Sequence, residues 1–131
     1  MHPRIGRVLP ILGLLLGLGG TGTAHAQDAA AGQRAFAQCS ACHTINADGR
    51  NGVGPNLHGV VGRKAASVEG FRYSAAMREK GQQGWSWTAD NVREYIRNPR
   101  AAVPGTSMAY PGMRNDEQLD SLIAYLEQKR P

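Results

Sequence analysis

The chain has 131 residues, of which 15 are Lys or Arg and 10 are Asp or Glu, giving a formal net charge of +5 at pH 7. This length suits one domain and leaves no room for a second. A charge this modest, with no basic run interleaved with aromatic residues, excludes nucleic acid as a partner and at most steers the protein toward an acidic one.

The order of segments in residues 1–26 is typical of a secretory signal peptide. A basic start is followed by an apolar run over residues 8–18 and by the small-residue cleavage triplet Ala24-His25-Ala26. The apolar run is about 11 residues long, whereas a membrane-spanning helix needs roughly 20, so we expect no stable membrane insertion. Cleavage would leave residues 27–131 as the mature domain in the periplasm, with 13 of the 15 basic residues.

The first predicted helix covers residues 27–38, which are rich in Ala, Gln and Arg. Asp28 is its expected N-cap, and Phe36 is its one large apolar residue. A glycine-rich stretch over residues 44–64 follows. It has no helical or alternating hydrophobic period, so it is predicted to be a loop. Loops of this length are commonly binding segments.

Two further helices are predicted in the middle of the chain. Residues 73–80 suit one or two helical turns ended by Gly81. A longer helix opens at Thr88 and runs to about Arg97, because Pro99 cannot continue it. Its apolar face is formed by Val92, Tyr95 and Ile96.

The last predicted helix follows a second irregular stretch at residues 100–112. Asn115 is its expected cap, and acidic residues in its first turn suit the helix dipole. Since no segment alternates at period two, we predict an all-α fold with three main helices, one short helix and long loops. The apolar face of the last helix consists of Leu119, Leu122, Ile123 and Leu126.

The two cysteines indicate the chemistry of the chain. Cys39-Ser40-Ala41-Cys42-His43 is the attachment signature of a c-type haem. Thiols one helical turn apart reach the two vinyl groups of a haem as thioethers, and the adjacent His supplies an axial imidazole to the iron. The predicted cofactor is one covalently attached haem c, which would also fill a core short of large apolar residues. The Pro55 carbonyl is favoured as the acceptor that orients the His43 ring.

Two other interpretations of the cysteine pair have to be weighed. A disulfide is possible, but the two-residue spacing makes a tight loop that gains little entropic stabilisation. A thioredoxin-like redox pair would need a strand before it and a helix after it. Here a predicted helix precedes the cysteines and a predicted loop follows them, which favours haem attachment.

The second axial position of the iron has four candidate ligands, which are His58, Met77, Met108 and Met113. His58 lies in the glycine-rich loop, and Met77 lies in a short helix where a packing role is expected. Spacing favours Met108 over Met113, because Met108 follows a Pro-Gly turn and has Thr106 available to tie the loop. A His/Met pair leaves the iron no open position, which indicates an electron carrier rather than an enzyme.

Seven motifs occur in one order along the mature chain: CSACHT (39–44), GPNLHG (54–59), GRK (62–64), GFRYS (70–74), YIRNP (95–99), PGTSM (104–108) and LIAYL (122–126). On these motifs the chain resembles the class I cytochromes c, in the branch of mitochondrial cytochrome c and bacterial cytochrome c2. The resemblance implies the cytochrome c fold around one covalent haem. It also implies a soluble mono-haem protein that shuttles single electrons through a low-spin His/Met haem.

The resemblance also implies roles for individual residues. Met108 matches the family's axial methionine, and Met113 falls outside that motif. Tyr95 matches a tyrosine near the methionine sulfur. The implied site comprises the iron ligands His43 and Met108, the thioether residues Cys39 and Cys42, the propionate-holding residues Arg63, Tyr73 and Trp87, and Pro55, Tyr95 and Thr106 near the ligands. The residues matched to the crossing of the first and last helices are Gly32, Phe36, Leu122 and Tyr125.

Redox proteins are the implied partners of this monomeric carrier. They are a quinol–cytochrome c oxidoreductase, a terminal oxidase, a photosynthetic reaction centre or a periplasmic dehydrogenase. Ser107 stands where the family has a lysine, and the mature chain has three lysines, so docking to a strongly acidic partner is a weaker expectation here. Alternatives are a dedicated acceptor for one dehydrogenase, a subunit of a sulfur-oxidising complex, and a haem enzyme or gas sensor. An apoptotic role does not suit a secretory signal peptide.

Overall fold

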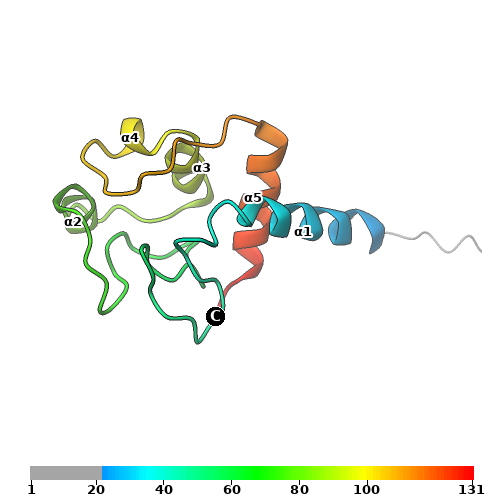
Figure 1. Cartoon of the computed structure of the whole chain (residues 1–131), viewed down its shortest axis with the longest axis horizontal. Coiled ribbons are helices and arrows are strands. Elements are labelled where there is room, and N and C mark those ends of the chain that lie inside the picture. Colours follow the sequence, from blue (N-terminus) through cyan, green and yellow to red (C-terminus); the bar gives the residue numbers. More distant parts are fainter. Residues whose placement is uncertain (1–21) are drawn as a thin grey trace, which may run out of the picture.

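The structure is a computed structural model that describes residues 22–131; the first 21 residues of the predicted signal peptide lie outside the described residues. Residues 22–131 contain no paired strands apart from an isolated bridge between Lys64 and Ser86. The all-α prediction is therefore confirmed. No helix within the same range has the length and apolar character that crossing a membrane requires. The helices are α1 (Gly22–Phe36), α2 (Ala75–Gln82), α3 (Ala89–Arg97), α4 (Pro99–Ala102) and α5 (Asp116–Gln128) (Figure 1).

Helix α1 begins earlier than the sequence suggested. It starts at Gly22, so Asp28 lies inside the helix and the prediction of an N-cap there is wrong. Alanine is the best helix former, and the alanine-rich stretch around the expected cap continues the helix in both directions. The helix ends at Phe36 and passes into turns, in which the Cys39 amide donates to the Phe36 carbonyl at 2.8 Å.

The caps of the later helices follow from local sequence. The side chains of Ser74, Thr88 and Asn115 each accept a hydrogen bond from the backbone amide three residues on. These bonds satisfy amides that a helix start would otherwise leave unpaired. The predicted start of α3 and the predicted cap of α5 are therefore confirmed.

Two helix boundaries differ from prediction. Helix α2 continues past Gly81 to Gln82. A side chain at position 81 would collide with the Ala65 carbonyl, so the glycine is required for close packing rather than for ending the helix. Pro99 ends α3 as expected but also opens α4, where proline is tolerated at the first helical position. Part of the stretch predicted to be irregular is therefore helical.

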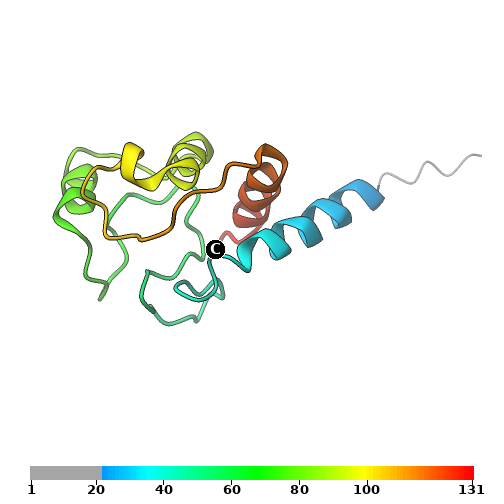
Figure 2. The ribbon, with the colours of Figure 1, turned by 45° about the horizontal axis from the view of Figure 1, so that its top comes forward.

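The core consists of two clusters of buried side chains. The larger one forms where α1 crosses α5, with Phe36 and Tyr125 ring centroids 5.7 Å apart (Figure 2). Gly32 permits this crossing, since a side chain there would collide with the Ser121 carbonyl. The smaller cluster consists of Ala65, Met77, Tyr95 and Val103. Residues of both clusters line the cavity that lies between them.

Candidate functional site

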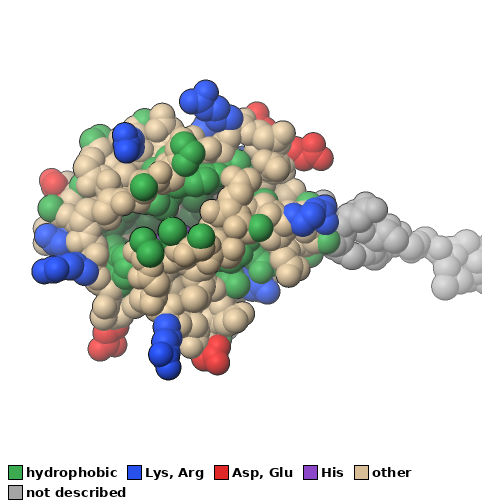
Figure 3. Space-filling model, viewed as in Figure 1, with side chains coloured by type: hydrophobic (Ala, Val, Ile, Leu, Met, Phe, Trp, Pro, Cys, Tyr) green, Lys and Arg blue, Asp and Glu red, His purple; other side chains and the backbone are tan. Residues whose placement is uncertain are grey.

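An apolar cavity of about 410 Å³ lies between the two clusters. Its volume falls within the range of small-molecule and cofactor sites. The space-filling view shows the cavity as a hollow lined mainly by hydrophobic side chains and open on one face (Figure 3). The ten residues that the sequence singled out all line it: Cys39, Cys42, His43, Pro55, Arg63, Tyr73, Trp87, Tyr95, Thr106 and Met108.

His43 is held in one orientation on the wall of this cavity. Its Nδ1 lies 2.7 Å from the Pro55 carbonyl oxygen, so Nδ1 donates the hydrogen bond and Nε2 keeps its lone pair. A side chain at Gly54 would bring its Cβ to 2.6 Å from Nδ1 and 2.7 Å from Nε2, so only glycine fits beside the ring. Burial lowers the pKa of His43, against the opposing effect of the Pro55 bond. The imidazole is therefore neutral, which is the form that binds a metal.

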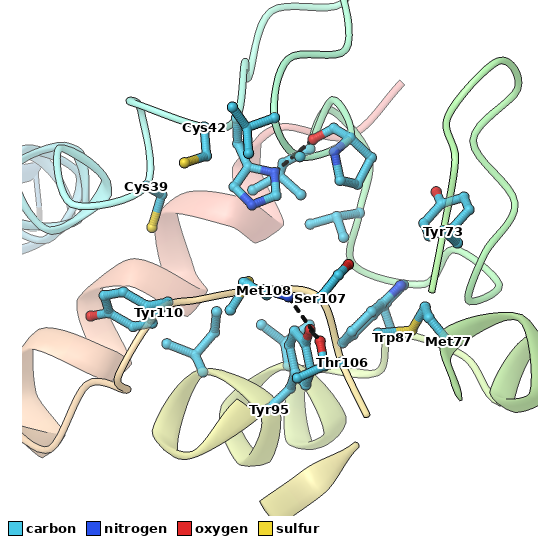
Figure 4. A pocket seen from close by; sticks show the side chains of 18 of the residues that line it. Cys39, Cys42, Tyr73, Met77, Trp87, Tyr95, Thr106, Ser107, Met108 and Tyr110 are labelled. Atoms are coloured by element: carbon cyan, nitrogen blue, oxygen red, sulfur yellow. Dashed lines mark hydrogen bonds between the residues drawn. The ribbon is translucent and has the colours of Figure 1, made fainter. Parts of the chain in front are cut away.

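Cys39 and Cys42 lie in the turns that follow α1, on one side of the cavity (Figure 4). Both are free of disulfide bonds. Burial, and secondarily the charge of Cys42, raise the pKa of the Cys39 thiol to about 11, whereas redox-active cysteines have lowered values. The pair is preceded by a helix and followed by a loop, whereas a thioredoxin-like pair needs a strand before it and a helix after it. These features favour neither alternative use of the pair.

The four candidate second ligands are separated by the tertiary structure. Met108 lies on the segment across the cavity from the cysteines (Figure 4). Met77 also lines the cavity but is buried in the smaller cluster, beyond Trp87 from Met108 in that view. Met113 is 3% exposed in the larger cluster, and neither it nor His58 lines the cavity.

A hydrogen-bonded pair ties the Met108 segment to α3. The Tyr95 hydroxyl lies 2.5 Å from Thr106 Oγ1, and the Met108 amide donates to the same oxygen at 3.3 Å. Tyr95 is buried, which raises its pKa and keeps its hydroxyl protonated. Because Tyr95 projects from a capped helix, this arrangement restrains the backbone of Met108.

Arg63 is the one cationic side chain among the described residues that line the cavity. Its two terminal nitrogens donate to the carbonyls of His58 at 3.1 Å and Asn56 at 3.0 Å. Its Nε is buried and has no acceptor among the described residues, and burial lowers the pKa of the guanidinium. A half-buried cation whose buried Nε is a free donor calls for an anionic group in the cavity. Haem propionates supply such a group, and this chemistry fits the cofactor.

Sequence reasoning missed several residues of the site. The Tyr110 hydroxyl donates to Gln38 Oε1 at 2.8 Å, which links segments 72 residues apart. Gly54 was quoted only within a motif, and its contact with the His43 ring was not foreseen. No local pattern indicates either contact, because each depends on where two distant loops meet.

The arrangement defines a class of protein. A neutral histidine follows two cysteines at the wall of an apolar cavity, and a methionine lies across from them. A half-buried arginine has one buried nitrogen, Nε, that lacks an acceptor among the described residues. This is the donor set of a protein that carries a covalently bound haem.

Comparisons with known proteins identify the family. The cytochrome c family model matches residues 29–129. Cytochrome c2 of Blastochloris viridis is 42% identical over 118 residues, covering 90% of this chain and 91% of that protein. Cytochrome c2 of Rhodoblastus acidophilus is 46% identical over 103 residues, covering 79% and 94% respectively. The chain belongs to the cytochrome c family, and it is a cytochrome c2-like mono-haem electron carrier with a covalent haem c, not an enzyme.

Solved structures agree with this assignment. Cytochrome cH from Methylobacterium extorquens superposes with a TM-score of 0.70 at 42% identity, covering 78% of this chain and 99% of that one. Cytochrome c2 from Rhodospirillum centenum superposes with a TM-score of 0.74 at 33% identity, covering 79% and 99%. The fold is therefore that of cytochrome c.

Proposed function

We propose that His43 and Met108 are the axial ligands of the haem iron and that Cys39 and Cys42 are its thioether attachments. The observation that carries this assignment is the bond from His43 Nδ1 to the Pro55 carbonyl, since it leaves Nε2 free for iron. The haem, when bound, supplies one-electron oxidation and reduction. The chain's own residues orient the imidazole, hold the methionine segment and exclude water from an apolar cavity.

The remaining site residues position the cofactor. Arg63, Tyr73 and Trp87 would hold the propionates on the side of the cavity where the free Arg63 Nε lies. The Tyr73 hydroxyl accepts a hydrogen bond from the Val68 amide at 3.0 Å, which fixes its ring. Tyr95 and Thr106 restrain the methionine segment through the hydrogen bonds described above.

The ligand assignment is tested by spectroscopy of the oxidised holoprotein. Methionine ligation produces a sulfur-to-iron charge-transfer band in the near infrared. We expect the band in wild type and in the Met77→Leu and Met113→Leu variants, and its loss in Met108→Ala. If the band survives in Met108→Ala and is lost in Met77→Leu, the iron ligand is Met77 and the assignment is wrong.

We propose that the partners are membrane redox complexes that the protein reaches from the periplasm. They are a quinol–cytochrome c oxidoreductase together with a terminal oxidase or a photosynthetic reaction centre. A periplasmic dehydrogenase is an alternative donor. Support comes from the cytochrome c2 relatives and from the signal peptide predicted for residues 1–26. The predicted cleavage and export are tested by N-terminal sequencing of the periplasmic holoprotein, with Gln27 expected as the first residue. A holoprotein that keeps residues 1–26 would contradict the cleavage.

A further inference from the structure

The mouth of the cavity is uncharged. Six residues line the cavity and are also exposed at the surface, and we call them the rim. No Lys, Arg, His, Asp or Glu is among them. Among the residues that the structure describes, Val53 is the one large hydrophobic side chain classed as exposed, at 81%. The rim consists of Gln38, Cys42, Val53, Ser107, Ala109 and Pro111.

None of the six rim residues carries a charged side chain. Arg63 lies inside the cavity and donates to two backbone carbonyls. Three further arginines form surface ion pairs with acidic residues of α5. In the space-filling view, Lys and Arg side chains lie toward the outline of the molecule, and the hollow is bordered by hydrophobic and uncharged groups (Figure 3). The ion pairs are Arg93–Asp120, Arg97–Asp116 and Arg130–Glu127.

We propose that the rim docks a redox protein whose own electron-transfer patch is uncharged and apolar, so that their association depends little on ionic strength. This inference rests on the proposed function, because a haem seated in the cavity comes closest to a partner at the rim. A rim without basic side chains offers nothing to an acidic patch, and one without acidic side chains offers nothing to a basic patch. An apolar partner instead removes Val53 and its neighbours from water, which favours contact by about 25 cal/mol for each Å² of apolar surface buried.

An uncharged rim also suits a carrier that must leave its partner quickly. Electron-transfer encounters are small and weak, and a modest apolar contact supplies enough affinity for them. Salt screens attraction between exposed charges, with a Debye length that falls from about 30 Å at 0.01 M to about 8 Å at 0.15 M. Apolar contact is not screened in this way, so the rate of electron transfer stays nearly constant over that range.

Electron self-exchange tests the inference with the protein itself as the probe. Oxidised and reduced copies of the holoprotein exchange electrons when their rims meet, and the rate is measured from NMR line widths in a partly reduced sample. With uncharged rims, we expect the rate to change by less than about threefold between ionic strengths of about 0.01 and 0.5 M. Two charged rims would repel each other at low salt, and the rate would then rise by about tenfold or more across the same range.

Charge placement provides the matched variants. Ser107→Lys puts a positive charge on the rim, so its self-exchange should slow at low salt and recover as salt is added. Gln128→Lys adds the same charge at the exposed last residue of α5, outside the cavity lining, and should behave as wild type. Val53→Ser removes apolar contact and should slow exchange equally at all salt concentrations.

The outcomes separate failure of the inference from failure of the proposed function. A wild-type rate that rises tenfold with salt overturns the inference and indicates a charged docking site for an acidic partner. Equal behaviour of Ser107→Lys and Gln128→Lys overturns it too, since electrons would then leave elsewhere than at the rim. The near-infrared charge-transfer band is recorded on each sample. Its loss in wild type overturns the proposed ligation, whereas its presence assigns any change in salt dependence to the surface.

Discussion

Removing the hydroxyl of Tyr110 should loosen the segment that carries Met108. Tyr110 follows Met108 by two residues, and its hydroxyl donates to Gln38, which adjoins Cys39. The bond thus joins the two sides of the cavity. Tyr110→Phe removes a single oxygen atom and keeps the ring, so the change isolates the hydrogen bond.

The size of the effect follows from the environment of the bond. A neutral hydrogen bond contributes about 0.5–1.5 kcal/mol, and the exposed position of this one favours the lower part of that range. We therefore expect the equilibrium between the closed and opened Met108 segment to shift by about 2- to 5-fold toward opening. The assay is titration of the oxidised holoprotein with imidazole, which displaces the methionine. The loss of the charge-transfer band reports the binding constant.

A double-mutant cycle separates the bond from other effects of the ring. Gln38→Leu should raise the affinity for imidazole by a similar factor, and the double variant should gain little beyond either single one. The reasoning is refuted if Tyr110→Phe binds imidazole as wild type does. It is equally refuted if the two single effects add in full, because independent sites behave in that way.

Two further predictions concern the site. Gly54→Ala should lower the unfolding free energy by several kcal/mol, since its Cβ would lie 2.6 Å from His43 Nδ1. Gly62→Ala is the matched control: a Cβ at Gly62 would meet open space, so the variant bears only the cost of the φ of +94°, about 1 kcal/mol. Both unfolding free energies are measured by chemical denaturation. Equal losses in the two variants would contradict the steric account. Arg63→Met should lower the reduction potential measured by spectroelectrochemistry, because a partly buried positive charge on the cavity wall favours the reduced state. An unchanged potential would place no propionate near Arg63.

Helix caps were predictable because they depend on a few adjacent residues. Thr88 and Asn115 accept hydrogen bonds from amides three residues on, and the sequence indicated both. The start of α1 was wrong by five residues, because an alanine-rich stretch contains no competing stop signal. The end of α2 was wrong because Gly81 is present for contact with a distant carbonyl, which local rules do not detect.

The sequence by itself determined the attachment signature, since two cysteines and a histidine within five residues place three donors on one stretch of backbone. Spacing already favoured Met108, but only the tertiary structure showed that Met113 is buried in the core and that Met108 lies across the cavity. It also created the uncharged rim, whose members come from three distant segments. Local chemistry is written within a few residues, whereas a surface or a ligand pair depends on how distant segments pack.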